Sequence, residues 1–210
     1  MTQNSKRLVT NLHLAVVCGL IFSILLSICG FSARCDRIRE RVFRLHILAN
    51  SDTQEDQACK LAVRDRLLRE GELIFSGAHN EAEAAAMAAE RLPQLQAAAQ
   101  DEVLRQGYDY PVRVEVARCR FNTRVYEETT LPAGEYEALR VILGDGAGHN
   151  WWCVMFPPMC LPAAQESEEL SQVLEEDEME IVGGGSKYEI KFKAVELYES
   201  VSQKLKEWFR

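Results

Sequence analysis

The chain has 210 residues, of which 47% are hydrophobic, and a formal net charge of -8. These values are sufficient for one domain with a real core, and they exclude an intrinsically disordered chain. The net charge arises entirely between residues 163 and 186, which hold eight Asp or Glu residues and no Lys or Arg. The rest of the chain is balanced and lacks the clustered basic surface that nucleic-acid binding requires.

A long apolar stretch, residues 12–31, follows Lys6 and Arg7 near the N-terminus. Its length is sufficient for a helix to span a bilayer. The basic residues before it favour a cytoplasmic N-terminus and export of the body, although four arginines between residues 34 and 41 weaken this argument. Gly30 and Ser32 form a small-x-small pair that a signal peptidase could cleave after Ser32. Residues 1–35 are therefore expected to be either a cleaved signal peptide or a retained membrane anchor.

The body is expected to start with a strand over residues 42–49, where apolar side chains partly alternate. A helix should follow, because Ser51 and Asp52 each stand three residues before a Gln or Glu, the spacing of a capping box. This helix is expected to end near Glu70, before Gly71. The residues expected on its inner side are Ala58, Leu61, Ala62 and Leu68.

A second helix is predicted from Asn80, which stands three residues before Glu83, to Gly107. Its apolar residues keep helical spacing, and Pro93 should kink or divide it. Beyond it the period changes to two, and strands are expected over residues 112–117, 121–125, 136–143 and 151–156. Hairpin connections favour antiparallel order. The predicted fold is α+β: a mainly antiparallel sheet of about four to five strands packed on helices, within a domain spanning residues 36–162.

The C-terminal part of the chain divides into two expected segments. The acidic residues 163–186, which end in three glycines and a serine, have the composition of a flexible linker. Residues 187–210 carry apolar side chains at helical spacing and predict an amphipathic helix. We expect it to dock on the core, with a membrane-surface or partner-docking role as the alternative.

The most distinctive segment is residues 143–160, LGDGAGHNWWCVMFPPMC. Its glycines predict a turn, and Trp151 and Trp152 begin a buried strand that the following prolines end. Adjacent strand residues point to opposite faces, so one tryptophan should be buried while the other is presented to a partner. The alternative is that both belong to the core. Cys153 and Cys160 flank the prolines and are expected either to form a disulfide or to remain free thiols.

No catalytic, metal or cofactor site is predicted. His149 and Cys153 would be about 13 Å apart along an extended strand, too far for a thiol and its base. The four histidines are scattered without the spacing of a zinc site, and the glycines fit no nucleotide-binding motif. Asp52 and Asp56 are explained by helix capping and helix-start charge, and Asp65 by a solvated helix face.

Three blocks of the chain resemble the stage II sporulation protein R family. They are RLHILANSD at residues 44–52 with the helix that follows, LPAGEY at residues 131–136, and the segment at residues 143–160. The resemblance implies a protein made in the developing forespore and exported to the intermembrane space. There it would activate a membrane-embedded aspartic protease that processes the precursor of sigma-E. The chain would then be a signalling ligand, not an enzyme, and would use no small-molecule substrate.

The family-matching positions also give the candidate partner-binding residues, although the resemblance does not say which of them touch the protease. These positions are Arg44, His46, Asn50, Asp52, Tyr136, Asn150, Trp151, Trp152, Pro157 and Pro158. One alternative is an extracytoplasmic thiol-dependent or wall-processing enzyme that uses Cys153, with His149 as its base. Another is a membrane-anchored structural protein.

Overall fold

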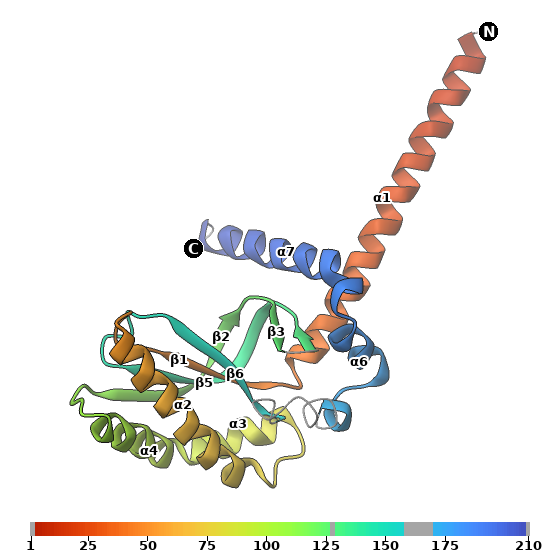
Figure 1. The fold of residues 1–210 in the computed structure, drawn as a ribbon. Coiled ribbons are helices and arrows are strands. Elements are labelled where there is room, and N and C mark those ends of the chain that lie inside the picture. The colour runs from red at the N-terminus through yellow and green to blue at the C-terminus, as the bar shows by residue number, and fades with distance from the viewer. Residues whose placement is uncertain (1–2, 127–128, 158–169, 209–210) are drawn as a thin grey trace.

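The computed structural model describes residues 3–126, 129–157 and 170–208. The strands are β1 (Phe43–Leu48), β2 (Val112–Phe121), β3 (Arg124–Tyr126), β4 (Thr129–Leu131), β5 (Gly134–Leu143) and β6 (Asn150–Phe156). The helices are α1 (Gln3–Arg39), α2 (Gln54–Phe75), α3 (Glu81–Glu90), α4 (Leu92–Arg105), α6 (Glu176–Gly183), the 3-10 turn η1 (Gly185–Tyr188) and α7 (Glu189–Trp208). The predicted α+β fold is confirmed, with helices α2 to α4 below a twisted sheet and α1 projecting from the other side of the body (Figure 1).

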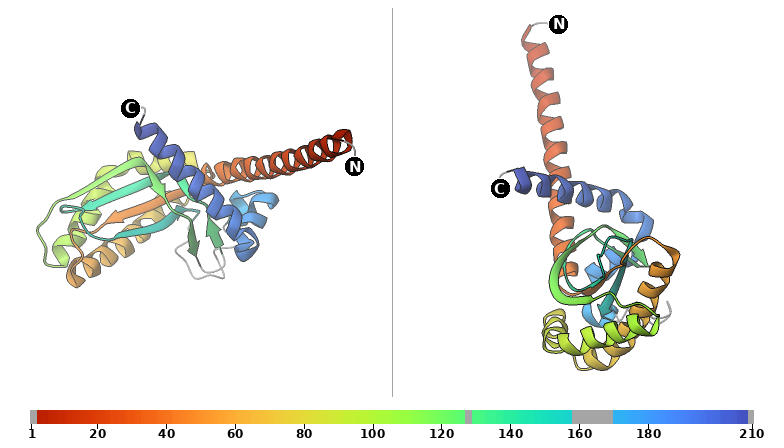
Figure 2. Two further views of the ribbon diagram at one scale, coloured as in Figure 1. Left: turned by 90° about the horizontal axis from the view of Figure 1, so that it is seen from above. Right: turned by 90° about the vertical axis from the view of Figure 1, so that its left-hand side faces the viewer.

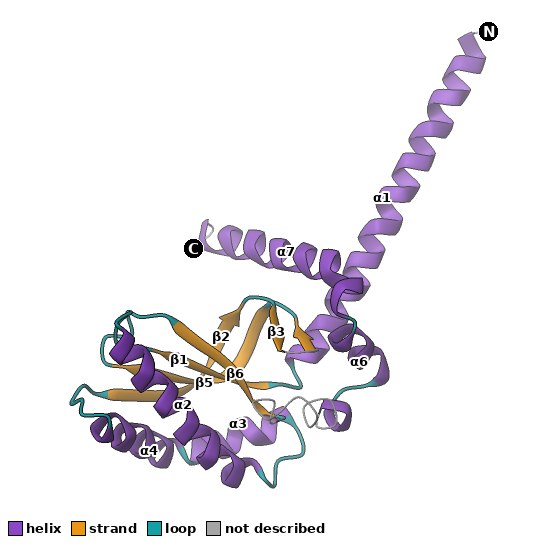
Figure 3. Cartoon of the chain, viewed as in Figure 1, coloured by secondary structure: helices purple, strands orange, loops and turns teal. Residues whose placement is uncertain are grey.

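The main sheet has four strands in the order β2-β5-β1-β6, and β3 and β4 form a separate pair beside it (Figure 3). β1 is parallel to β5, because the three helices after β1 carry the chain to the far edge of the sheet before β2 turns back into β5. The other two pairings in the main sheet are antiparallel. β2 pairs with β5 without interruption from Val112 to Phe121, so the strand expected over residues 121–125 is divided between the end of β2 and β3.

Helix α2 differs from expectation at both ends. Thr53 is its N-cap and accepts a hydrogen bond from the backbone N–H of Asp56, so the predicted caps lie one and two residues too early. The helix also continues through Gly71 to Phe75. A Cβ at Gly71 would stand 2.7 Å from the Cε of Met155, so this glycine permits close packing of α2 on the sheet and does not end the helix.

The next helices follow the sequence closely. The side chain of Asn80 caps α3 by accepting from the N–H of Glu83, as predicted. Pro93 stands in the first turn of α4 and divides the predicted long helix into α3 and α4. Gly107 follows α4 with φ of 87°, a left-handed conformation that glycine adopts at low cost.

Each face of the sheet has its own apolar core, and alternate residues of β1 point to opposite faces. Leu45 and Ile47 face α2, α3 and α4 and are fully buried. On the other face, β2, β5 and β6 pack against the end of α1, α6 and the start of α7 (Figure 2). We call this the second core, and Phe31 and Ile38 of α1 are fully buried in it. The final turns of α1 are therefore part of the folded body.

Helix α1 is long and apolar enough to cross a membrane. Its apolar side chains from Leu12 to Leu26 are exposed wherever the structure describes them. The same helix runs without a break into the buried turns that begin at Phe31. The N-terminal segment is thus an exposed apolar helix joined directly to the domain, as expected of a signal sequence or an anchor.

The acidic stretch is more ordered than its composition predicts. Residues 158–169 lie outside the described part of the chain, but α6 and η1 occupy most of the remainder. Arg37 pairs with Asp177 at 2.8 Å and with Glu178 at 2.9 Å, and Arg41 lies 3.3 Å from the fully buried Glu178. The arginines that follow the apolar stretch therefore neutralise part of the acidic segment, which a flexible-linker interpretation overlooked.

Candidate interaction surface at the end of the sheet

Two loops, residues 49–53 after β1 and residues 144–149 before β6, are held together by Asn50. Its side-chain oxygen accepts from the backbone N–H of Asp145 at 3.0 Å, and its amide donates to Asp56 at 2.9 Å. Its backbone carbonyl accepts from the N–H of Ala147 at 3.2 Å. We call these segments the paired loops. Asn50 thus has a positioning role that explains its place in the first family-like block.

Glycines allow the paired loops to approach one another. A Cβ at Gly144, which has φ of 55°, would lie 2.1 Å from the side-chain oxygen of Asn50. A Cβ at Gly148 would lie 2.1 Å from the backbone oxygen of Ser51. The predicted glycine-rich turn is confirmed, and close backbone contact across the loops adds a second reason for glycine.

Two buried charged residues of α2 support the paired loops from below. Asp56 accepts a hydrogen bond from the Ser51 hydroxyl at 2.5 Å. Burial raises the pKa of Asp56, but the hydrogen bonds from Ser51 and Asn50 together lower it further, so its pKa lies below the ordinary value. Lys60 donates to the carbonyl of His149 at 3.0 Å, and burial lowers its pKa. The role of Lys60 was not predicted. Its spacing could have indicated burial, because Asp56, Lys60 and the buried Val63 follow one another at intervals of four and three residues and therefore share one side of the helix.

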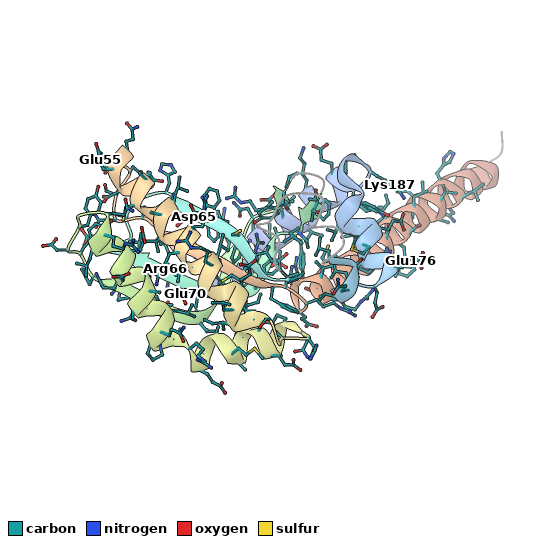
Figure 4. All side chains as sticks on the ribbon, turned by 60° about the horizontal axis from the view of Figure 1, so that its bottom comes forward. Glu55, Asp65, Arg66, Glu70, Glu176 and Lys187 are labelled. Carbon is teal, nitrogen blue, oxygen red and sulfur yellow. The ribbon has the colours of Figure 1, made fainter. Side chains whose placement is uncertain are left out.

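Asp52 joins the paired loops at their exposed tip. One of its carboxylate oxygens accepts from the backbone N–H of His149 at 2.6 Å and also contacts Nδ1 of the His149 ring. The contacts with His149 lower the pKa of Asp52. Asp52 is therefore a link between loops and not the helix cap that its spacing predicted. Asp65, labelled in Figure 4, is exposed on α2 as expected and pairs with Arg64 at 2.6 Å.

Trp151 and Trp152 are each half-buried and lie on opposite sides of β6. Trp152 stacks on His46 with ring centroids 3.8 Å apart and meets Phe121 edge-on at 4.6 Å. Trp151 lies beneath the guanidinium of Arg64, whose central carbon is 4.4 Å from the ring centroid. Their placement on opposite faces is confirmed, but the prediction that one is buried and the other presented is wrong, because both are half-buried.

His46 connects Trp152 to the start of β6. Its Nε2 lies 3.1 Å from the side-chain oxygen of Asn150. Burial lowers the pKa of His46 to about 4, and the hydrogen bond to Asn150 offsets only part of this effect. Near neutral pH the imidazole is therefore uncharged and provides a flat platform for Trp152.

Arg44 and Tyr136 lie inside the second core. The guanidinium carbon of Arg44 is 3.9 Å from the centroid of Phe121 and 4.7 Å from that of Tyr136. Arg44 also donates to the hydroxyl of Tyr126, and burial lowers its pKa. The Tyr136 hydroxyl donates to the carbonyl of Pro132 at 2.6 Å. Arg44 and Tyr136 are both almost fully buried, and their contacts give them structural roles.

The candidate positions thus separate into two groups. The first group lies at the surface. With the exposed His149 it forms what we call the sheet-end surface, which consists of the exposed Asp52, His149 and Asn150 and the half-exposed Trp151 and Trp152. Asn50 and His46 support it from beneath. Arg44, Tyr136 and Pro157 are buried, although Pro157 lines a cavity between α2 and the end of β6. Pro158 lies outside the described residues.

The described residues provide little for catalysis. Cys153 is 2% exposed and disulfide-bonded, while the predicted partner Cys160 lies outside the described part of the chain. His149 is directed to Asp52. Within the described ranges no group of three or more His, Cys, Asp or Glu residues could hold a metal ion.

Comparison with known proteins identifies the family. The family model described as stage II sporulation protein R matches residues 39–166. A curated relative, the stage II sporulation protein R of Bacillus subtilis (strain 168), is 37% identical over 123 residues, which cover 59% of this chain and 55% of the relative. The chain thus aligns with about half of that relative's length. No solved structure matches significantly. The chain belongs to the stage II sporulation protein R family.

Proposed function

We propose that the chain is an extracytoplasmic signalling ligand that activates a membrane-embedded aspartic protease, which then cleaves the precursor of sigma-E. Family membership supports this role, since it associates the chain with sporulation. The single structural observation that carries the proposal is the sheet-end surface, where half-buried tryptophans at the start of β6 lie beside exposed polar groups of loops that hydrogen bonds hold together. We propose that α1 delivers this surface to the space between the forespore and mother-cell membranes.

The proposed mechanism is binding that favours the active state of the protease. A ligand shifts such an equilibrium only by as much as its affinity differs between the two states. Aromatic side chains such as Trp152 commonly contribute most of the free energy of binding at protein interfaces. The paired loops are ordered before binding, so little conformational entropy is lost on association. The ligand itself makes and breaks no bond.

The alternative of a thiol enzyme has less support. A nucleophilic cysteine must be a thiolate within reach of a base. Cys153 is buried and disulfide-bonded, and the ring of His149 is occupied by Asp52. A role for Cys153 in holding the end of β6 agrees better with these contacts.

The proposal is tested by expressing the chain, the protease and the sigma-E precursor together in a host that does not sporulate. Asp52→Ala/His149→Ala changes the sheet-end surface. Asp65→Ala/His79→Ala is the matched control, since both of its positions are exposed and lie elsewhere. We expect the first pair to reduce precursor cleavage by about tenfold or more, the loss typical of one important interface residue, and the control pair to leave it unchanged. Equal cleavage with and without the wild-type chain would overturn the proposal.

A further inference from the structure

The last helix, α7, carries an apolar face that the body does not cover. Leu197, Val201, Leu205 and Trp208 follow one another at intervals of three or four residues and so lie on one side of the helix. Leu197 is 66% exposed and Trp208 is 80% exposed. The apolar stripe continues beyond Glu199, the last residue of α7 with a described contact to the body, as far as Trp208.

The opposite side of α7 is the one that packs on the body. Phe192 and Val195 are buried beside Phe31 in the second core, and Glu199 lies 3.3 Å from Arg39. Val201 follows Phe192 by nine residues, or about two and a half helical turns, and therefore points in the opposite direction. The apolar stripe faces away from the domain.

α7 also lies on the side of the body from which α1 projects. It runs across α1 near the level at which α1 leaves the body, as Figure 1 and the right-hand view of Figure 2 show. Phe31, the first buried residue of α1, contacts Phe192 with ring centroids 5.4 Å apart, and the exposed apolar part of α1 ends just before it. A bilayer that encloses the apolar part of α1 would therefore have its surface at α7.

The charges of α7 are unevenly distributed around the helix. Lys204 and Lys193 lie beside the apolar stripe, and Lys193 pairs with Glu189 at 2.6 Å. The ammonium of Lys191 lies 5.6 Å from the ring centroids of Phe31 and Tyr188, where α7 meets α1, and Glu196 and Glu199 are half-buried and lie toward the body. Helices that lie in the plane of a membrane combine an apolar face with lysines, whose ammonium groups reach the headgroups while their methylene groups cover apolar surface. Anionic phospholipid is the ligand that matches both features.

We propose that α7 is an interfacial helix that embeds its apolar stripe in the outer surface of the bilayer that α1 crosses, with its lysines at anionic headgroups. This contact fixes the orientation of the body relative to the membrane. It does not depend on a protease, so it holds or fails separately from the function proposed above.

The test uses the full chain reconstituted into vesicles of phosphatidylcholine and phosphatidylglycerol with brominated acyl chains, which quench nearby tryptophan fluorescence. Subtracting the spectrum of Trp208→Phe from that of the wild type isolates Trp208, because Trp151 and Trp152 lie in the body. We expect the Trp208 signal to be strongly quenched. An unquenched Trp208 signal overturns the proposal.

A pair of double variants tests the apolar stripe directly. Leu197→Gln/Leu205→Gln should shift the balance between embedded and free α7 by roughly 100-fold, because two leucines no longer leave water, and should abolish most of the quenching. Leu73→Gln/Leu104→Gln changes two leucines on α2 and α4 that are at least as exposed on average, at 78% and 57%, and should leave the quenching intact. Equal quenching in both variants contradicts the proposal. A second contradicting result is a chemically cross-linked dimer that forms through α7 while Trp208 remains unquenched. The apolar stripe would then bind a second copy of the chain and not the membrane.

Discussion

The ring of Phe31, in the first helix of the chain, meets the ring of Phe192, in the last helix, edge-on with centroids 5.4 Å apart. Phe31 also stacks on Tyr188 at 5.7 Å and is fully buried. Cleavage after Ser32 would remove this side chain from the second core. A cleaved chain would therefore lack this part of the second core, whereas a retained anchor would keep it.

Phe31→Ala should destabilise the contact between α1 and α7. Replacing a buried phenylalanine by alanine typically costs about 3–5 kcal/mol in the free energy of unfolding. The measurement is thermal unfolding of the full chain in detergent. Phe22→Ala is the control, because Phe22 is 63% exposed on the same helix. If both variants unfold at the same temperature, Phe31 does not contribute to the folded body.

Arg44 tests whether a buried family position acts through stability or through contact with a partner. Arg44→Met retains length and removes the charge, and it leaves no buried carboxylate unpaired among the described contacts of Arg44, so we expect a small effect on stability. Arg44→Lys should be the more destabilising change, because a strongly hydrated ammonium cannot stack between Phe121 and Tyr136 as the guanidinium does. Denaturant titration gives the order of the two variants. A folded Arg44→Met chain that fails to stimulate precursor cleavage would instead indicate direct contact with the partner.

His46 predicts a pH dependence of stability. Its pKa is about 4 in the folded chain and 6.5 in an unperturbed one, so between these values the unfolded chain binds the additional proton. The contribution of His46 to the free energy of unfolding is therefore constant above pH 6.5 and falls as the pH is lowered toward 4. His46→Gln should reduce this slope in urea titrations, and the exposed His79→Gln should not. An unchanged slope in His46→Gln would show that other groups cause it.

Gly148 is predicted to be intolerant of any side chain. Gly148→Ala forces a Cβ against the backbone oxygen of Ser51, which cannot move without separating the paired loops, and should cost about 1–3 kcal/mol in the free energy of unfolding. Gly183→Ala is the matched change in open space within α6, where removal of glycine is neutral or stabilises by up to about 1 kcal/mol. Similar unfolding midpoints for the two variants would contradict the close approach of the loops.

Local patterns in the sequence predicted most of the elements. Asn80 and Pro93 carry signals that act within a few residues, and both hold in the structure. The alternation that places Trp151 and Trp152 on opposite faces is equally local. Patterns failed where polar residues are buried. The buried side of α2 consists of Cys59, Val63 and Leu67 together with Asp56 and Lys60, whose side chains bond to the paired loops. Because this side includes charged residues, the sequence wrongly predicted Ala58 and Leu61, which are exposed, as its inner residues.

Contacts between distant segments could not be predicted from the sequence. The buried position of Arg44 depends on aromatic residues of β2 and β5 that no local rule associates with it. The order of α6 depends on Arg37 and Arg41, more than a hundred residues earlier in the chain. Composition alone therefore predicted a flexible linker where two partly exposed arginines pair with the buried Glu178.

The most direct test of the account is a reconstituted cleavage assay with the purified full chain, the protease in vesicles and the sigma-E precursor. We expect cleavage to rise and saturate as the chain is added, the chain to be recovered unaltered, and replacement of the catalytic aspartate of the protease to abolish cleavage. Cleavage that does not depend on the chain, or that continues with the inactive protease, would contradict the account.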